Sequence, residues 1–287
     1  MKALFASAVG AFASSWYNFS SVNCAASKSP FSHADFRQYT LMNFYDESHD
    51  TRVFRFALPE ADMSLNLEVL SFVELRHVGK DGSVLVRPFA PINSSNQRGY
   101  FEILVKNYQN SKVGNYLFSL KKGDAAEFKG PFVRVPIKSN RYKKIGILAS
   151  DTGIAPVYQV ARNVLRAPNN KTEISLIYEN TRKEDVLLGN ELNELMQTYP
   201  LFSPYFVLSK APSDWMGGVG HITKEMVKAL MPAPNRVGDS IILVSGPPPF
   251  LDSILGNKEN GTSPAEQGDL KGVLSELGYI QKMVFKI

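Results

Sequence analysis

The stretch ILASDTGIAP, residues 147–156, decides the fold. An apolar run leads into the Thr-Gly pair at 152–153 and closes on Pro156, the pattern of a buried strand that turns sharply into a helix. In an α/β sheet such a turn brings main-chain N–H groups and a helix N-terminus close to a phosphate. Small, uncharged residues are usual there, whereas this chain carries Ser150 and Asp151. The stretch predicts a nucleotide-binding loop with two unusual residues.

The sequence that follows repeats the alternation of apolar strands and helices. Near-continuous apolar strands separated by helices indicate a parallel sheet covered on both faces. Ligands of such sheets bind beyond the carboxyl ends of the strands, so we expect a site where these strands end. Thr223 is the expected N-cap of the third helix. The predicted strands are 144–150, 173–180, 205–210, 240–246 and 279–287, and the predicted helices are 157–165, 184–196, 223–230 and 250–255.

Before residue 139 the spacing of apolar residues is that of short β-strands rather than of alternating strands and helices. Short runs rich in Val, Phe, Leu and Tyr are separated by Pro, Gly, Asn and Asp, which predicts a small antiparallel barrel or sandwich. Apolar and polar residues alternate most clearly at 102–106, and one helix is expected within 111–124, ending at Gly123. The predicted strands are 51–58, 64–75, 82–89 and 99–108.

Composition narrows the class of protein. At 287 residues the chain suits one large domain or two ordinary ones, and 44% apolar with 21% charged residues is typical of a globular protein. The net charge of +5 fits an acidic partner or an anionic cofactor, or simply a solvated basic surface, but no clustered basic run predicts nucleic-acid binding. Cys24 is the single cysteine and the four histidines are scattered, so we expect neither a disulfide nor a metal site.

The first 34 residues differ from the rest. They contain Lys2 and Lys28, many Ala and Ser residues, and no acidic residue. The apolar part, 3–13, is too short for an ordinary membrane-spanning helix. A mitochondrial presequence is the preferred reading, because a secreted protein would more often contain paired cysteines. A membrane-contacting helix, with the remainder in the cytosol, and a disordered N-terminus are the alternatives.

Two more turns carry candidate binding residues. RPFAPIN at 87–93 ends a predicted barrel strand, where an Arg can contact a phosphate and the two prolines stiffen the backbone. SGPPPF at 245–250 leaves a parallel strand, where a Gly permits close approach of a ligand and the prolines form a rigid wall. Taken alone, 87–93 is better explained as a solvated strand-end Arg beside two turn prolines, and 245–250 could equally be a rigid structural turn.

Taken together, these fragments resemble the NADH–cytochrome b5 reductase family of ferredoxin-reductase-like flavoenzymes. The resemblance extends from about residue 50 to the C-terminus. It implies an antiparallel β-barrel FAD-binding domain at 35–138 and a parallel Rossmann-like NAD(P)-binding domain at 139–287, preceded by the targeting or anchor segment at 1–34 that the N-terminal composition indicates. The matching segments, in order, are 87–93, 99–108, 111–117, 120–131, 152–156, 176–195, 220–223 and 246–250.

The resemblance also implies which residues hold the cofactors and which lie at the reacting atoms. The FAD set is Arg87, Phe89, Ala90, Asn93, Lys106, Lys112, Val113 and Gly114. The NADH or NADPH set is Thr152, Gly153, Pro156, Ser209, Lys210, Ser245, Gly246, Pro247, Pro248 and Phe250. Ala90, Lys106, Thr152 and Ser245 are expected at the reacting atoms. In this relay a reduced nicotinamide gives hydride to FAD, which passes electrons singly to an acceptor.

The chain departs from the family pattern at several of these positions. Phe89, Ala90 and Gly114 replace residues that supply hydroxyl groups to FAD. Ser209 replaces an Asp that accepts the adenosine ribose hydroxyls, and Lys210 beside it could favour a 2′-phosphate. Ser245 and Phe250 replace Cys and Met.

Asp151 replaces a Gly beside the dinucleotide pyrophosphate. Two like charges ~5 Å apart at an effective dielectric constant of ~20 repel by roughly 3 kcal/mol, about two decades in affinity.

Two function classes follow. The first is an FAD-dependent oxidoreductase that passes electrons from NADH or NADPH to an acidic haem protein or similar acceptor. The second is a catalytically degenerate relative, retained as a subunit of a mitochondrial multi-subunit complex. Membrane association through the N-terminus is compatible with either class.

Overall fold

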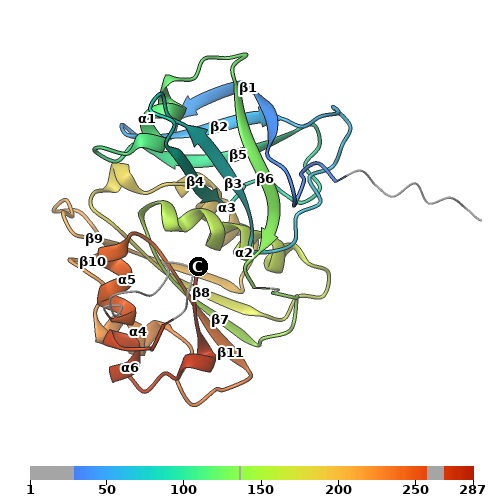
Figure 1. Cartoon of the computed structure of the whole chain (residues 1–287). Helices are drawn as coiled ribbons and strands as arrows, with labels where there is room; N and C mark the ends of the chain where they lie inside the picture. The colour runs from blue at the N-terminus through green and yellow to red at the C-terminus, as the bar shows by residue number, and fades with distance from the viewer. Residues whose placement is uncertain (1–28, 136, 257–267) are drawn as a thin grey trace, which may run out of the picture.

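The computed structural model describes residues 29–135, 137–256 and 268–287, which form two units, each built on a six-stranded sheet (Figure 1). The first unit carries an antiparallel sheet in the order β4-β3-β6-β1-β2-β5. The N–H of Ile92, just after β4, donates to the carbonyl of Glu102 in β5 (3.0 Å), so the two edges meet and the sheet closes into a barrel. Its elements are β1 (Arg37–Asp46), β2 (Thr51–Ala57), β3 (Ser71–Val78), β4 (Val84–Phe89), β5 (Tyr100–Lys106), α1 (Lys112–Ser119) and β6 (Ala125–Val133).

Aromatic side chains fill the barrel interior. Phe56, Phe101 and Phe128 are fully buried, and their rings pack edge-to-face or stacked with centroids 4.9 to 5.6 Å apart. Such pairs add about 0.5–1.5 kcal/mol each beyond their burial. This interior fixes the barrel whose end carries part of the cleft described below.

Several predictions for this unit need correction. Strands β1 and β6 were not expected. Strand β1 is mostly exposed but buries Tyr39 and Leu41 at alternate positions, and β6 contains the turn-like pair Gly130-Pro131. The segment 64–75 is a strand only from Ser71 onward. The alternation at 102–106 does not mark an exposed face, since Glu102 is buried and its carboxylate accepts hydrogen bonds from Arg55.

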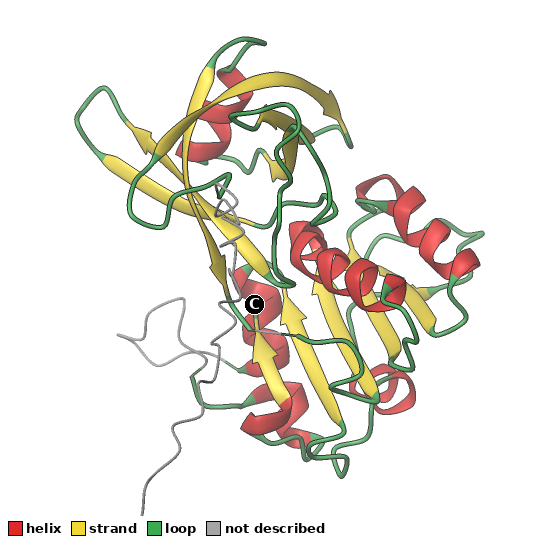
Figure 2. Ribbon diagram, turned by 90° about the vertical axis from the view of Figure 1, so that its right-hand side faces the viewer, coloured by secondary structure: helices red, strands yellow, loops and turns green. Residues whose placement is uncertain are grey.

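The second unit carries a parallel sheet in the order β10-β9-β8-β7-β11-β12. The chain proceeds outward from β7 to β10 and then crosses back to β11, so the strand order reverses between β7 and β11. Helices cover both sides (Figure 2). The elements are β7 (Lys144–Ser150), α2 (Ile154–Arg166), β8 (Glu173–Asn180), α3 (Gly189–Thr198), β9 (Phe202–Leu208), β10 (Gly218–Val219), α4 (Lys224–Leu230), β11 (Ser240–Ser245), α5 (Pro248–Leu255), α6 (Gly272–Glu276) and β12 (Val284–Lys286).

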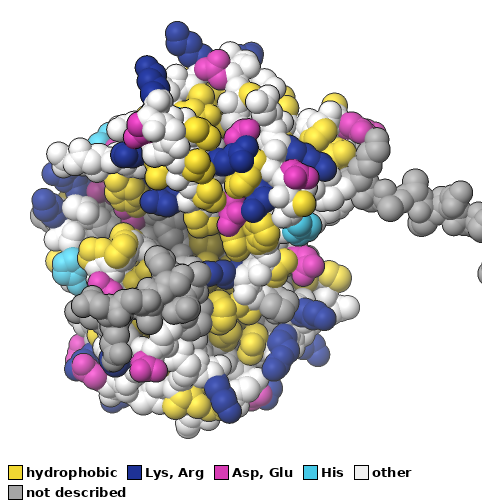
Figure 3. Space-filling view, viewed as in Figure 1, with side chains coloured by type: hydrophobic (Ala, Val, Ile, Leu, Met, Phe, Trp, Pro, Cys, Tyr) yellow, Lys and Arg dark blue, Asp and Glu magenta, His cyan; other side chains and the backbone are white. Residues whose placement is uncertain are grey.

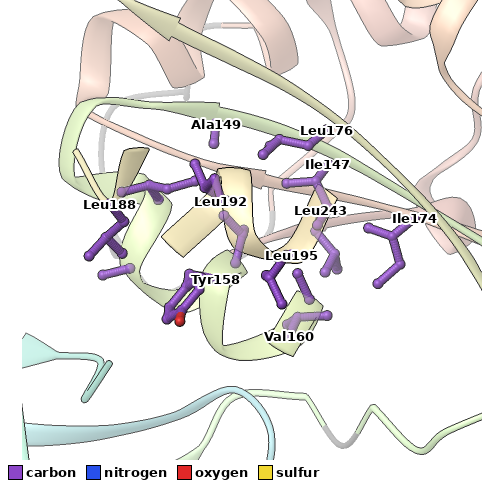
Figure 4. Close-up of a cluster of buried hydrophobic side chains, with 14 of the residues drawn as sticks. Ile147, Ala149, Tyr158, Val160, Ile174, Leu176, Leu188, Leu192, Leu195 and Leu243 are labelled. Carbon is purple, nitrogen blue, oxygen red and sulfur yellow. The ribbon is translucent and has the colours of Figure 1, made fainter. Parts of the chain in front are cut away.

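Two apolar layers hold the helices on this sheet. On one face, side chains of α2 and α3, among them Val160 and Leu192, form one buried cluster with Ile147 and Leu176 of the sheet (Figure 4). On the other face, Val227 of α4, Ile254 of α5 and other residues of α4 to α6 form a separate buried cluster. The prediction of a parallel sheet covered on both faces is confirmed.

Several helix boundaries differ from the predictions. Helix α1 ends at Ser119 rather than at Gly123, α2 begins at Ile154 rather than 157, and α5 begins at Pro248 rather than 250. Helix α3 begins at Gly189 rather than 184, because Leu188 has a left-handed φ of 54° and the preceding residues 183–185 form a separate 3-10 turn. The five-residue helix α6 was not expected. Thr223 is the N-cap of α4, and its hydroxyl accepts from the N–H of Met226, as the sequence predicts.

The predicted segment 1–34 lies almost wholly outside the described residues. The predicted boundary at 138/139 falls within the connection between β6 and β7. Among the described residues, no helix combines the length and apolar character needed to cross a membrane. In Figure 3, hydrophobic side chains gather where the two units meet, and basic and acidic side chains are interspersed above and below them.

Candidate functional site

A cleft of about 850 Å³ lies between the two units. It is bounded by the end of β4, the end of β5 and the start of α1 on the barrel side, and by the loops after β7 and β11 on the other. Those two loops leave the strands between which the order reverses, where open α/β sheets bind their ligands. The predicted site residues that line the cleft are Arg87, Phe89, Ala90, Lys106, Val113, Gly114, Thr152, Gly153, Pro156, Ser245, Gly246, Pro247 and Pro248.

The loops after β7 and β11 interlock through two glycines. A Cβ on Gly153 would lie 2.3 Å from the carbonyl oxygen of Ser245 and 2.6 Å from the nitrogen of Gly246. A Cβ on Gly246 would lie 3.2 Å from the carbonyl oxygen of Ser150. The two turns can therefore approach this closely only because neither glycine carries a side chain. This contact brings Thr152 and Ser245, predicted separately from sequence, to one wall.

The remaining predicted residues lie beside the cleft rather than in its lining. Lys112 is exposed at the first position of α1. Phe250 is buried under Gly246, since a Cβ there would meet its ring at 2.6 Å. Ser209 and Lys210 follow β9, and their N–H groups donate to the carbonyls of Asn180 and Thr181 in the turn after β8.

Asn93 has a structural partner. Its side-chain amide donates to Glu102 Oε2 at 2.8 Å, and its carbonyl oxygen accepts the N–H of Glu102. Arg55 donates to the other oxygen of that carboxylate from 2.7 Å. Asn93 therefore ties the segment after β4 to β5 and supports the barrel wall behind Ala90.

The barrel side of the cleft has the donors and shape that a flavin dinucleotide requires. Arg87 brings a guanidinium to the lining, and α1 begins there with Ser111 as N-cap, whose Oγ accepts from Gly114 N at 2.9 Å. The partial positive charge of a helix N-terminus attracts phosphate. A buried oxygen, Asn107 Oδ1, has no hydrogen-bond partner among the described residues and lies 2.8 Å from where a Gly114 Cβ would be. The residues present fit FAD.

The nucleotide side joins the barrel through a charged cluster. Lys106 Nζ lies 3.3 Å from Asp50 Oδ2 in the β1–β2 turn and 3.3 Å from Asp151 Oδ1 in the loop after β7. The hydroxyl of Tyr108 donates to Asp151 Oδ2 at 3.1 Å and lies 3.2 Å from Thr152 Oγ1. The Lys106 and Asp151 side chains are only 17% and 19% exposed, so solvent screens their attraction weakly.

The pKa values in the cluster follow from burial and neighbouring charge. Burial lowers the pKa of Lys106, but Asp151 and Asp50 outweigh it and the pKa lies above the usual value. Burial, reinforced by the charge of Asp151, raises the pKa of Tyr108. Burial opposes ionisation of Asp50, yet hydrogen bonds from Thr51 and the charge of Lys106 leave its pKa lowered. Lys106 is therefore charged and Tyr108 neutral near pH 7.

Sequence reasoning missed several residues here. Asp50, Tyr108, Ser111 and Arg134 were not predicted, although Tyr108, Ser111 and Arg134 line the cleft. Tyr108 lies two residues beyond Lys106, so the end of β5 gave a usable signal. Asp50 has no such signal, because it meets Lys106 only through the pairing of β2 with β5.

The repulsion estimated from sequence treats Asp151 as an unpaired charge that faces the pyrophosphate. In the structure its carboxylate is paired instead. Its carboxylate is turned toward Lys106 and Tyr108, and the residue is not part of the lining. Its backbone has a left-handed φ of 53°, and its carbonyl accepts from the Tyr178 hydroxyl at 3.0 Å.

Known proteins resemble both units. Residues 38–136 match the family model of an oxidoreductase FAD-binding domain, and residues 147–255 that of an oxidoreductase NAD-binding domain. NADH-cytochrome b5 reductase 2 of Aspergillus terreus is 38% identical over 240 residues, covering 83% of this chain and 74% of the relative. The protein of that name from Saccharomyces cerevisiae is 38% identical over 244 residues, covering 84% and 79%.

Solved structures show the same fold. The cytochrome b5 reductase domain of Ulva prolifera nitrate reductase superposes with a TM-score of 0.77 at 24% identity, covering 90% of this chain and 100% of that domain. The CS-b5R domains of human Ncb5or, in the NAD+ form, superpose with a TM-score of 0.70 at 20% identity, covering 88% and 69%. The predicted architecture, a barrel followed by a parallel nucleotide-binding sheet, is confirmed.

Proposed function

Because this chain belongs to the NADH–cytochrome b5 reductase family of FAD- and NAD-binding oxidoreductases, we propose that it passes electrons from NADH through FAD to a b5-type haem protein. The chain is an FAD-dependent oxidoreductase that uses NADH. The haem acceptor is inferred from the names of the relatives, which are NADH-cytochrome b5 reductases. The net charge of +5 is compatible with an acidic haem protein.

One observation carries the proposal: a single cleft is lined by both units at the strand-order reversal. FAD supplies the chemistry that converts a two-electron donor into single-electron transfers. The chain holds it with the guanidinium of Arg87 and the start of α1, near Val113 and Gly114, and flanks it with Pro88 and Ala90.

The opposite wall positions the nicotinamide donor. Thr152 and Ser245 line the cleft, and Pro247 and Pro248 stiffen the backbone beside them. The close contact at Gly153 and Gly246 fixes the distance between the loops after β7 and β11. The residues on this side therefore act by orientation and by excluding water, the contributions a protein makes when a cofactor carries the reaction.

The experiment uses purified full-length protein loaded with FAD under anaerobic conditions. Adding NADH should bleach the flavin absorbance band, and adding oxidised cytochrome b5 should then produce the reduced haem spectrum. If FAD binds but NADH leaves the band unchanged, the chain is a non-catalytic relative. If NADH bleaches the band but the haem stays oxidised, a different acceptor is required.

We also propose that residues 1–34 direct the protein to mitochondria. Two lysines, many Ala and Ser residues and the absence of an acidic residue support this proposal. A fusion of these residues to a fluorescent protein should colocalise with a mitochondrial marker. Fluorescence on other membranes would favour an N-terminal anchor instead, and diffuse fluorescence would contradict both readings.

A further inference from the structure

The carboxylate of Asp151 contacts groups that a phosphate would otherwise engage. It lies 3.3 Å from the Lys106 ammonium and accepts from the Tyr108 hydroxyl at 3.1 Å. Lys106, Tyr108 and Thr152 all line the cleft, whereas Asp151 does not. Ammonium and hydroxyl groups are donors that bind carboxylate and phosphate alike. The chain therefore supplies its own anion to donors on the nucleotide-facing side.

The charge balance of the cluster disfavours a second anion. Among the described residues, Lys106 is the one lysine or arginine within ion-pair distance of both Asp50 and Asp151, so one ammonium faces two carboxylates. His49 also lies near Asp50, at 3.5 Å, but its side chain is 62% exposed. A dinucleotide adds two phosphate charges to this arrangement. Lys106 can strengthen its contact with a phosphate only if it weakens its contact with one of the carboxylates.

Lys106 is an ion-pair partner of Asp151 rather than a well-aligned hydrogen-bond donor to it. Asp151 Oδ1 is buried and has no hydrogen-bond partner of good geometry among the described residues, although Lys106 Nζ is 3.3 Å away. The loop, in contrast, is firmly held, since the Tyr178 hydroxyl donates to the Asp151 carbonyl and Gly153 packs on Ser245. A ligand can thus compete for the side-chain contacts while the backbone stays in place.

We propose that Asp151 is a specificity-determining residue, an internal anion that competes with the phosphates of the nicotinamide dinucleotide for Lys106 and Tyr108. This inference rests on the proposed function, because it concerns the dinucleotide side of the same cleft. Asp151 weakens dinucleotide binding while leaving FAD binding unchanged, because Arg87 and the start of α1 lie on the barrel side. To reach Lys106 and Tyr108, a phosphate of the dinucleotide must displace the carboxylate of Asp151 from them.

A merely structural role for Asp151 has different consequences. Its side chain joins the two units through Lys106 and Tyr108. If this link were the only role of Asp151, changing the residue would lower thermal stability and weaken the binding of every ligand. The variant Asp151→Asn separates the two roles, because the amide keeps the size of the side chain and an oxygen that accepts from Tyr108. The substitution removes the negative charge and leaves Lys106 facing a neutral amide in place of a carboxylate.

The test is isothermal titration of the FAD-loaded protein with NAD+, which binds without reducing the flavin. Asp151→Asn should bind NAD+ about tenfold more tightly, because it frees the Lys106 ammonium from one of its two carboxylate partners. Lys106→Met should bind more weakly. In the double variant the gain from Asp151→Asn should be much smaller, because the gain requires a freed ammonium group.

The matched control is Asp239→Asn, which removes a carboxylate 2.7 Å from Lys143 at an exposed site away from the cleft. It should leave NAD+ affinity unchanged. Equal or weaker NAD+ binding by Asp151→Asn, or no binding by any variant, would overturn the inference. Reduction of the flavin by NADH, measured in parallel, tests the proposed function separately. Tighter NAD+ binding without flavin reduction would support the role of Asp151 and contradict the reductase.

Discussion

Replacing Gly153 with Ala should separate the two loops that form the nucleotide-facing wall. The new Cβ would lie 2.3 Å from the Ser245 carbonyl oxygen, 2.5 Å from its carbon and 2.6 Å from the nitrogen of Gly246. All three atoms belong to the backbone, so no side chain can move aside. Ordinary contact begins at 3.4 Å, and the loops must therefore move apart by about 1 Å.

The expected magnitude follows from this displacement. Overpacking of a buried site costs about 1–3 kcal/mol, so the free energy of unfolding should fall by that amount. A misplacement of ~1 Å at a reacting site can cost ~100-fold in rate, and we expect kcat/KM for NADH to fall between 10- and 100-fold. FAD affinity should change little, because Arg87 and α1 lie on the barrel side.

The assays are urea denaturation and steady-state NADH oxidation with ferricyanide as acceptor. Gly189→Ala is the control, because its Cβ would meet no atom nearer than 3.7 Å and Ala favours a helix over Gly by about 1 kcal/mol. That control should be at least as stable as the original protein and equally active. A Gly153→Ala variant with unchanged stability and unchanged kcat/KM would refute the reasoning from loop contact.

Three further predictions concern the pH dependence of stability, the affinity for FAD and the preference for NADH over NADPH. Burial raises the pKa of Tyr39 and of Tyr279 from 10.0 to about 12, so the unfolded chain loses these protons first and stability should fall between pH 10 and 12; a denaturation midpoint that stays constant over this range would contradict it. Ala90→Ser should tighten FAD binding about fivefold, because it adds a hydroxyl worth ~1 kcal/mol to the cleft lining; flavin fluorescence titration measures this, and weaker binding would mean that the hydroxyl meets no acceptor. Ser209→Asp should shift the ratio of kcat/KM for NADH over NADPH at least tenfold toward NADH, because a carboxylate accepts ribose hydroxyls and repels a 2′-phosphate; an unchanged ratio would place the adenosine ribose elsewhere.

The order of elements was predictable from sequence because it depends on local patterns. Apolar strands such as β7 and β11 bury both faces and read as continuous apolar runs. Strand β1 was missed although it gave a usable signal, since Tyr39 and Leu41 are buried in the barrel core and alternate with exposed residues. The start of α3 depends on a positive φ at Leu188, which its residue type does not reveal.

In the candidate site, too, features that depend on local residue type could be predicted and long-range contacts could not. The glycines and prolines of the loops after β7 and β11 could be predicted, because each residue type has a direct backbone consequence. The partners of Asp151 could not, since Lys106 and Tyr108 reach it from another sheet, 45 and 43 residues away in the chain. Sequence identified the unusual charge, whereas the structure identified the lysine and the hydroxyl that face it.

The flavin absorbance during anaerobic addition of NADH tests the central claim most directly. The chain is an FAD-dependent reductase that uses NADH, and we propose that both cofactors share the cleft between the two units. The purified, FAD-loaded protein should lose its flavin absorbance band within seconds of adding one equivalent of NADH and recover it when air is admitted. A band that stays unchanged with excess NADH would contradict the account.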